Sequence, residues 1–261
     1  LVVGSVNQTA TYASGDNSTT LVFQYTIQAG DNDTNGISIG EDSLALNSGT
    51  IRDAAGNNAT LTHSSVADNS SYKVDTTPPT VSGVAITSAA GIQNNFLNAD
   101  DNVSVTATFS ENVPVTGTPQ LTLVVGSVNQ PATYASGDNS TTLVFQYTIQ
   151  AEDNDTNGIS IGEDSLALNG GTIRDAAGNN ATLTHSSVAD NSSYMVDTSA
   201  PTVDNFTITD TKLLVGETMT VNLGFSEKVI EFIAADINLD NATGTLPSMI
   251  TSDDNRTWSG T

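Results

Sequence analysis

The chain of 261 residues contains no cysteine, which excludes disulfide bonds, thiolate nucleophiles and metal sites built on cysteine. Its two histidines, His63 and His185, occupy the same position of an internal repeat, so a single repeat offers no histidine pair for zinc. Basic residues number 6 against 29 acidic ones, and the net charge is -23. Because nucleic acids and anionic membranes are bound through Lys and Arg, neither is an expected partner.

Aromatic residues and long apolar runs are scarce as well. Aromatic side chains make up 5% of the chain, with one Trp, which gives no sign of an aromatic-lined cleft for sugar chemistry. No apolar run approaches the ~20 residues of a membrane-spanning helix, and no Gly-rich phosphate loop follows a strand and opens a helix. We therefore expect a non-catalytic protein. The chain has no initial Met and no visible signal peptide, and we expect it to be an excerpt of a longer protein.

What the chain does contain is a long internal repeat. Residues 1–77 return as residues 123–199, offset by 122 residues and with five differences. A period of this length matches one whole domain rather than one turn of a solenoid, so we expect domains in tandem. The differing pairs are Thr9/Pro131, Gly30/Glu152, Ser48/Gly170, Lys73/Met195 and Thr77/Ser199.

Short connectors that contain proline separate the predicted domains. They read VDTTPPTV at 74–81 and VDTSAPTV at 196–203. Proline fixes its own φ and favours extended geometry in the residue before it, so each connector is expected to be fairly stiff. The expected domains are a partial repeat at 1–77 that lacks its first strands, a complete repeat at 78–199, and a divergent partial domain at 200–261 that lacks its last strands.

Apolar and polar residues alternate in the complete repeat, which indicates half-buried strands. The stretches VSVTATF (103–109) and LVFQYTI (143–149) each place four apolar residues on one face, and QLTLVV, SGVAIT, ATYA and SLALN are shorter candidates. About seven strands in about 120 residues predict an all-β fold of tandem immunoglobulin-like (Ig-like) antiparallel β-sandwiches. In the divergent domain, VIEFIAADI (229–237) could form one helical turn.

The motifs VTATFSENVPVTGTPQLTL, LVFQYTIQAGDN, LALNSGTIRDAAGNNATL and YKVDTTPPTV resemble the tandem Ig-like repeats of large bacterial surface proteins. These include biofilm-associated and RTX-type adhesins and the repeats associated with swimming or flagellar systems. The resemblance covers residues 1–199. Residues 200–261 look like a second class of bacterial Ig-like domain found in the same proteins. The resemblance implies an extracellular segment that holds an adhesive tip away from the cell, and it implies nothing about the ligand.

Strands that alternate in direction collect acidic residues at both ends of the complete repeat. We call the end where the 74–81 connector arrives the near pole, and the opposite end the far pole. Carboxylates gathered closely repel one another unless a cation bridges them, and calcium takes 6–8 oxygen ligands. The near pole is predicted to gather a joint cluster of Asp75, Glu111, Asp175 and Asn179. Its counterparts along the chain are Asp53, Asn57, Asp197 and Glu227. The alternatives are an Asx-type turn for RDAAGNN and a solvated strand end for the glutamates.

The far pole is predicted to hold the loop DNDTNG, which fits the ligand spacing of an EF-hand. Its flanks read as strands, so the alternatives are a calcium loop inside a β-protein and a plain acidic turn. The candidate ligands are Asp31, Asp33, Asn35 and Asp42 in the first copy, Asp153, Asp155, Asn157 and Asp164 in the second, and Asp101 from a neighbouring loop.

Two functions remain open at this point. The first is a structural extender of a surface adhesin, rigidified by Ca²⁺ at its joints, whose partners are the neighbouring repeats of the same chain. The second is a module that binds glycan or protein through its loops. The two copies are nearly identical throughout, loops included, which counts against the second.

Overall fold

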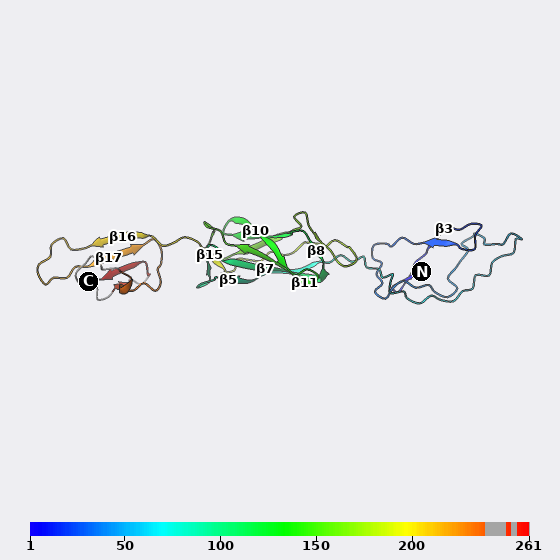
Figure 1. Ribbon diagram of the computed structural model, residues 1–261, viewed down its shortest axis with the longest axis horizontal. Coiled ribbons are helices and arrows are strands. Elements are labelled where there is room, and N and C mark those ends of the chain that lie inside the picture. Colours follow the sequence, from blue (N-terminus) through cyan, green and yellow to red (C-terminus); the bar gives the residue numbers. More distant parts are fainter. Residues whose placement is uncertain (238–248, 252–254, 261) are drawn as a thin grey trace. The chain divides into compact units, whose positions relative to one another are not determined.

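The computed structural model describes residues 1–237, 249–251 and 255–260, and within them it consists almost entirely of strands and loops (Figure 1). The chain divides into two compact units, Leu1–Asp197 and Thr198–Thr261. The boundary between these units, at 197/198, lies two residues before the predicted boundary at 199/200. The predicted boundary at 77/78 lies within the first unit and stays a prediction. Among the described residues, no helix is long and apolar enough to cross a membrane.

The main sheet of the complete repeat has six strands, all antiparallel to their neighbours. The strand order across the sheet is β13-β9-β10-β11-β7-β5. The strands are β5 (Val81–Ala90), β7 (Asn102–Val113), β9 (Gln120–Val125), β10 (Val128–Ser136), β11 (Ser140–Thr148) and β13 (Ser160–Ala167).

Smaller sheets complete this repeat. One has the order β12-β15-β6 and contains the parallel pair β15–β6, and another pairs β14 with β8. These strands are β6 (Phe96–Leu97), β8 (Val115–Thr116), β12 (Asn154–Asp155), β14 (Thr172–Ile173) and β15 (Met195–Asp197).

The core of the repeat follows the alternation in the sequence. In β7, Val103, Val105, Ala107 and Phe109 are buried while the residues between them are half-buried or exposed. The stretch 143–149 that contains most of β11 does the same, and its buried residues pack against those of β7 in one apolar cluster. Both predicted apolar faces are thus confirmed. Burial of these side chains is the main favourable contribution to folding, at about 25 cal/mol per Å² of apolar surface.

The antiparallel pairings also confirm the predicted strand directions. β7 runs antiparallel to both β5 and β11, and β13 runs antiparallel to β9. The ends of β7 and β13 therefore lead toward the near pole, where the RDAAGNN turn follows β14. The Ile149 N–H donates to the Asp101 carbonyl oxygen, and the Asp100 N–H donates to the Ile149 carbonyl oxygen. These two bonds place the 98–101 loop beside the start of the 150–158 loop at the far pole.

Residues 1–77 form the same kind of structure with far fewer strands, and Figure 1 shows this region as mostly irregular chain. β1 pairs with β2, β3 pairs with β4, and isolated bridges such as Asp33↔Val74 and Ile39↔Val66 hold the rest. The strands are β1 (Val2–Val3), β2 (Val6–Asn7), β3 (Thr11–Ser14) and β4 (Val22–Gln24).

The second unit contains a four-stranded antiparallel sheet with the order β16-β17-β19-β18. Trp258 is buried, and its ring centroid lies 5.0 Å from that of Phe232 in an edge-to-face contact. The predicted helical turn is present as η1, a short 3-10 turn at Ala234–Asp236. The strands are β16 (Val203–Ile208), β17 (Val221–Phe225), β18 (Met249–Thr251) and β19 (Thr257–Gly260).

Candidate metal centre

The connector is fastened to the near pole by a pair of main-chain and side-chain hydrogen bonds. The Thr80 N–H donates to Oγ of Ser110 at 3.0 Å, and the Ser110 N–H donates to the Thr80 carbonyl oxygen at 2.9 Å. Since Ser110 immediately precedes Glu111 in β7, this pairing holds the glutamate beside the incoming connector. Ser110 therefore positions Glu111 beside the connector, a role that the sequence alone did not reveal.

The RDAAGNN turn presents Asp175 at the same place. Its Oδ1 accepts hydrogen bonds from the N–H groups of Gly178 and Asn179, at 2.7 and 2.8 Å. Gly178 has φ of 98°, which lies in the left-handed region that favours glycine. This is the Asx-type turn that the sequence offered as an alternative. An ionised carboxylate has about four acceptor sites, so the hydrogen bonds of the turn do not use all the acceptor sites of Asp175.

Asn179 ties this turn to the connector. Its Nδ2 donates to Oδ2 of Asp175 at 2.7 Å and to the main-chain oxygen of Asp75 at 3.1 Å. Asp75, Glu111 and Asp175 each offer one carboxylate oxygen, and these oxygens lie within 4.8 Å of one another. The predicted joint cluster therefore comes together, although its residues are far apart in the sequence.

The charges of the cluster are unbalanced. Burial and then the neighbouring Asp175 and Asp75 carboxylates raise the pKa of Glu111. Burial also raises the pKa of Asp175, but hydrogen bonds from the Asn179 side chain and from the N–H groups of the turn more than offset it and lower the pKa overall. Among the described residues, no basic side chain forms an ion pair with these three carboxylates. The cluster therefore favours either a proton on Glu111 or a bound cation.

The geometry fits calcium. Ca²⁺–oxygen distances are about 2.3–2.6 Å, so two ligands on opposite sides of one ion lie up to about 5 Å apart. The carboxylate oxygens lie within 4.8 Å of one another, inside that limit. Asp75 is exposed, Glu111 half-buried and Asp175 buried, so the cluster opens to solvent on the connector side. Water could therefore supply the remaining ligands.

The counterparts of the joint cluster are only partly assembled. Asp53 makes the same turn with Asn57, whose side chain and N–H lower the pKa of the aspartate. No described glutamate gathers with Asp53 into a group of three candidate ligands. In the second unit, Ser226 and Thr202 repeat the hydrogen-bonded pair of Ser110 and Thr80, so Glu227 occupies the place of Glu111. Asp197 belongs to the first unit, and its relation to Glu227 stays a prediction.

The EF-hand-like loop is organised differently from the joint cluster. The Asp155 carboxylate accepts hydrogen bonds from the N–H groups of Gly126 and Gly158, at 2.7 and 2.8 Å. Asp153 accepts from the Tyr147 hydroxyl at 2.6 Å and from the Gln130 side chain at 3.0 Å. These carboxylates face donors from their own turn and from other strands. The sequence did not reveal these partners.

The same arrangement occurs in the first copy. The N–H of Gln28 and then the Tyr25 hydroxyl are the main causes that lower the pKa of Asp31. Burial and the bond to Asp31 raise the pKa of Tyr25 to about 12. The N–H of Gly4 and that of Gly36 both donate to Asp33, and the pKa of this aspartate is lowered.

The remaining loop candidates also bond to protein groups rather than to a common centre. Each makes a hydrogen bond within its own copy: Asn35 to Asp68, Asn157 to Asp190, Asp42 from the N–H of His63, Asp164 from the N–H of His185, and Asp101 from the N–H of Asn98. The geometry thus favours the acidic turn over a calcium loop. Calcium at this loop stays a prediction.

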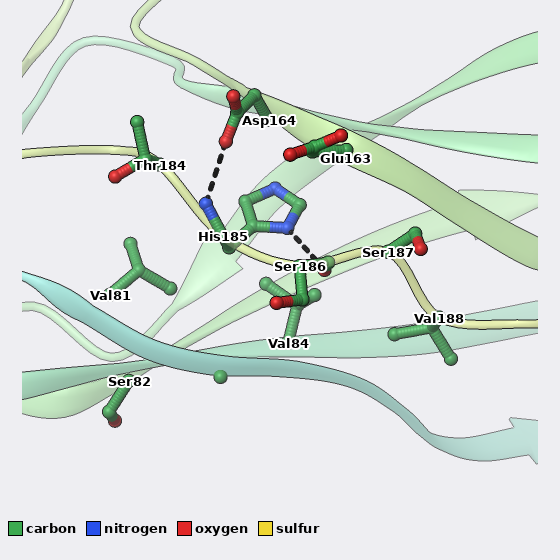
Figure 2. Close-up of a pocket in the computed structure, with 11 residues that line it drawn as sticks. Val81, Ser82, Val84, Glu163, Asp164, Thr184, His185, Ser186, Ser187 and Val188 are labelled. Atoms are coloured by element: carbon green, nitrogen blue, oxygen red, sulfur yellow. Dashed lines mark hydrogen bonds between the residues drawn. The ribbon is translucent and has the colours of Figure 1, made fainter.

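A shallow groove lies beside the main sheet, lined by β5, β13 and the 184–188 segment (Figure 2). It encloses about 560 Å³ and is open to solvent. His185 sits in it with Nδ1 donating to the Ser186 oxygen at 2.9 Å and Nε2 accepting from the Ser165 N–H at 2.9 Å. Both ring nitrogens are thus occupied by protein groups, which makes this histidine structural.

The comparison with protein families gives one match. Residues 197–261 match the bacterial Ig-like domain family. Together with the antiparallel sheets of both units, this match confirms the predicted fold class, an all-β protein of Ig-like β-sandwiches. Bacterial Ig-like domains are typical modules of extracellular and surface proteins, and they are typically non-catalytic. No curated protein and no solved structure matches the chain.

Proposed function

We propose that this chain is a non-catalytic extender of a bacterial cell-surface adhesin, in which calcium at the joint cluster stiffens the connector between repeats and so supports adhesion or biofilm formation. The near-identity of residues 1–77 and 123–199 supports a spacer, since a spacer needs length and copies serve as well as variants. The match to the bacterial Ig-like domain family supports a surface location. β7, with 12 residues at about 3.3 Å each, gives one repeat a length of about 40 Å.

The convergence of Asp75 with Glu111 and Asp175 is the observation that carries the calcium part of the proposal. Asp75 belongs to the connector, whereas Glu111 and Asp175 belong to the sandwich that follows it. A cation shared by the three carboxylates would restrict the connector, and Asn179 already links its main chain to the same turn. Calcium would supply positive charge where three acidic groups gather, and the cluster residues would fix its position.

A calcium titration of the full chain by calorimetry tests this proposal. We expect a site with a Kd of about 10⁻⁴–10⁻³ M, the range of extracellular modules, and we expect Asp75→Asn to weaken it at least about tenfold. Asp16→Asn is the matched control, because Asp16 is exposed and lies outside the cluster. Equal calcium binding by both variants, or no binding by the native chain, would contradict the calcium part of the proposal.

A further inference from the structure

The connection between β13 and β14 contains a two-residue turn centred on Asn169 and Gly170. The Gly171 N–H donates to the Leu168 carbonyl oxygen at 2.8 Å, and both central residues have positive φ, 47° for Asn169 and 79° for Gly170. This is the geometry of a type I′ turn, for which Asn-Gly is a preferred sequence. Both central residues are exposed, and the Gly170 N–H makes no hydrogen bond within the described chain. The backbone nitrogen that follows the Asn169 side chain is therefore unprotected.

An asparagine that precedes glycine can lose its side-chain amide to attack by its own backbone. The Gly170 nitrogen forms a bond to Cγ of Asn169, the Cγ–Nδ2 bond breaks, and the Gly170 proton leaves with Nδ2 as ammonia. Water then opens the cyclic imide. Cleavage between the Gly170 nitrogen and Cγ gives aspartate, and cleavage between that nitrogen and the main-chain carbonyl carbon gives isoaspartate. Glycine favours the attack, because it has no Cβ beside the nitrogen and its backbone turns freely.

The other Asn-Gly pair of the complete repeat, Asn157 and Gly158, is held in a way that opposes this reaction. The Gly158 N–H donates to Oδ1 of Asp155 at 2.8 Å, and Gly158 is buried. The Asn157 Nδ2 donates to the Asp190 carboxylate. Hydrogen bonds to a charged acceptor are stronger than those between neutral groups, so the attacking nitrogen and the amide under attack are both fixed.

Asn169 is tethered more weakly. Its Nδ2 donates to the Thr118 carbonyl oxygen at 3.1 Å, which is an exposed hydrogen bond between neutral groups. Opening an exposed turn costs much less free energy than unfolding a whole domain. The amide can therefore leave Thr118 and present its Cγ to the Gly170 nitrogen while the repeat stays folded.

The first copy shows the same turn with a different second residue. There Asn47 and Ser48 have φ of 45° and 69°, and the Gly49 N–H donates to the Leu46 carbonyl oxygen at 2.7 Å. Serine thus replaces Gly170 without changing the turn. Its Cβ crowds the attacking nitrogen, so a turn with serine should react more slowly than one with glycine.

We propose that Asn169 is a site of spontaneous deamidation, which converts it to aspartate and isoaspartate and loosens the β13–β14 turn as the protein ages. Isoaspartate adds an atom to the backbone where there is little room, since a Cβ on Gly117 would lie 2.7 Å from the Cα of Gly171. Aspartate loses the donor to Thr118 and adds a negative charge. The β14–β8 pairing follows this turn directly, so both products should weaken it. This reaction goes beyond the role of an extender and does not involve calcium.

The test incubates the full chain at mildly alkaline pH and follows two fragments by mass spectrometry. Fragment 164–175 carries Asn169 and differs from its first-copy counterpart at Gly170, and fragment 152–163 carries Asn157 and differs at Glu152. Fragmentation of the second peptide separates Asn157 from Asn154. In the folded chain we expect Asn169 to become an acid at least about tenfold faster than Asn157, with isoaspartate among the products. In denaturant, where neither turn exists, the two sites should react at similar rates.

Gly170→Ser is the matched variant, because the first copy shows that serine is compatible with the turn. It should slow the conversion of Asn169 by about tenfold and leave Asn157 unchanged. Hydrogen exchange of fragment 164–175, which includes β14, measures the loosening. The exchange should be faster in converted chains than in fresh ones, and Gly170→Ser incubated for the same time should exchange like fresh chains.

Three outcomes would overturn the proposal. The first is conversion of Asn169 in denaturant but not in the folded chain, and the second is equal rates at Asn169 and Asn157 in the folded chain. The third is unchanged hydrogen exchange in converted chains, because the turn would then absorb the modification without loosening.

Discussion

Replacing Glu111 with Gln should change the stability of the complete repeat in opposite directions with and without calcium. Without calcium, the substitution removes a charge from among three carboxylates whose oxygens lie within 4.8 Å. At that separation a pair of like charges repels by about 0.9 kcal/mol in water, less with salt screening, so we expect the variant to be about 0.5–1 kcal/mol more stable.

With calcium, the order should reverse. A site with Kd of about 10⁻⁴–10⁻³ M at 10 mM calcium stabilises the native chain by about 1.4–2.7 kcal/mol. For a unit of about 120 residues this raises Tm by about 5–11 °C. Glu111→Gln loses a charged ligand, so its Tm should rise by less than about 2 °C on adding calcium.

Calorimetry of the full chain in chelator and in 10 mM calcium measures both effects. Hydrogen exchange of the fragment 102–113, whose sequence occurs once in the chain, assigns the transition to the complete repeat. Glu163→Gln is the matched control, because Glu163 is exposed and outside the cluster. A Glu111→Gln variant that gains as much from calcium as the native chain would refute the reasoning.

The raised pKa of Glu111 predicts that the stability of the complete repeat depends on pH. Since its folded-state pKa lies above the ordinary value of 4.5, protonation of Glu111 stabilises the folded state. Without calcium, that contribution is present below pH 4.5 and is lost as the pH rises through the raised pKa. Calcium competes with the proton, so calcium-dependent stabilisation should be lost over the same window as the pH falls. Glu111→Gln should remove both dependences.

Two further predictions concern Phe145 with its first-copy counterpart Phe23, and the far-pole loop. Phe145→Ala should cost about 3–5 kcal/mol of stability in chemical denaturation, whereas Phe23→Ala, at a site 39% exposed, should cost about 1 kcal/mol or less. Equal losses of stability would mean that Phe23 is as deeply buried in solution as Phe145. Tyr147→Phe removes the hydroxyl that donates to Asp153 and should cost about 1–2 kcal/mol, by the same amount in chelator and in calcium. A cost that appears only in chelator or only in calcium would mean that the loop binds the ion.

The architecture of the complete repeat follows from its sequence because alternation fixes which face of a strand is buried. The buried positions of β7 could be read from VSVTATF, and strand reversal then placed Glu111 and Asp175 at one pole. Because of that placement, the sequence could group Asp75, Glu111 and Asp175, which are separated by 36 and 64 positions.

The far-pole loop could not be predicted in the same way. An Asp-x-Asp-x-Asn-Gly spacing suits a calcium loop and a hydrogen-bonded turn alike. The groups that distinguish them come from elsewhere in the sheet: the N–H of Gly126 from the turn between β9 and β10, and the hydroxyl of Tyr147 from β11. The fastening of Thr80 to Ser110 is equally non-local. Its recurrence at Thr202 and Ser226 was visible only as the shared letters FSE.

The most direct test of the calcium-stiffened joint is a distance distribution across it. The chain has no native cysteine, so spin labels on Thr19→Cys and Thr141→Cys, both at exposed positions, report only on residues on either side of the 74–81 connector. Pulsed electron paramagnetic resonance should give a narrower distribution in calcium than in chelator, and Asp75→Asn should remove the difference. Distributions of equal width in calcium and chelator would contradict the account.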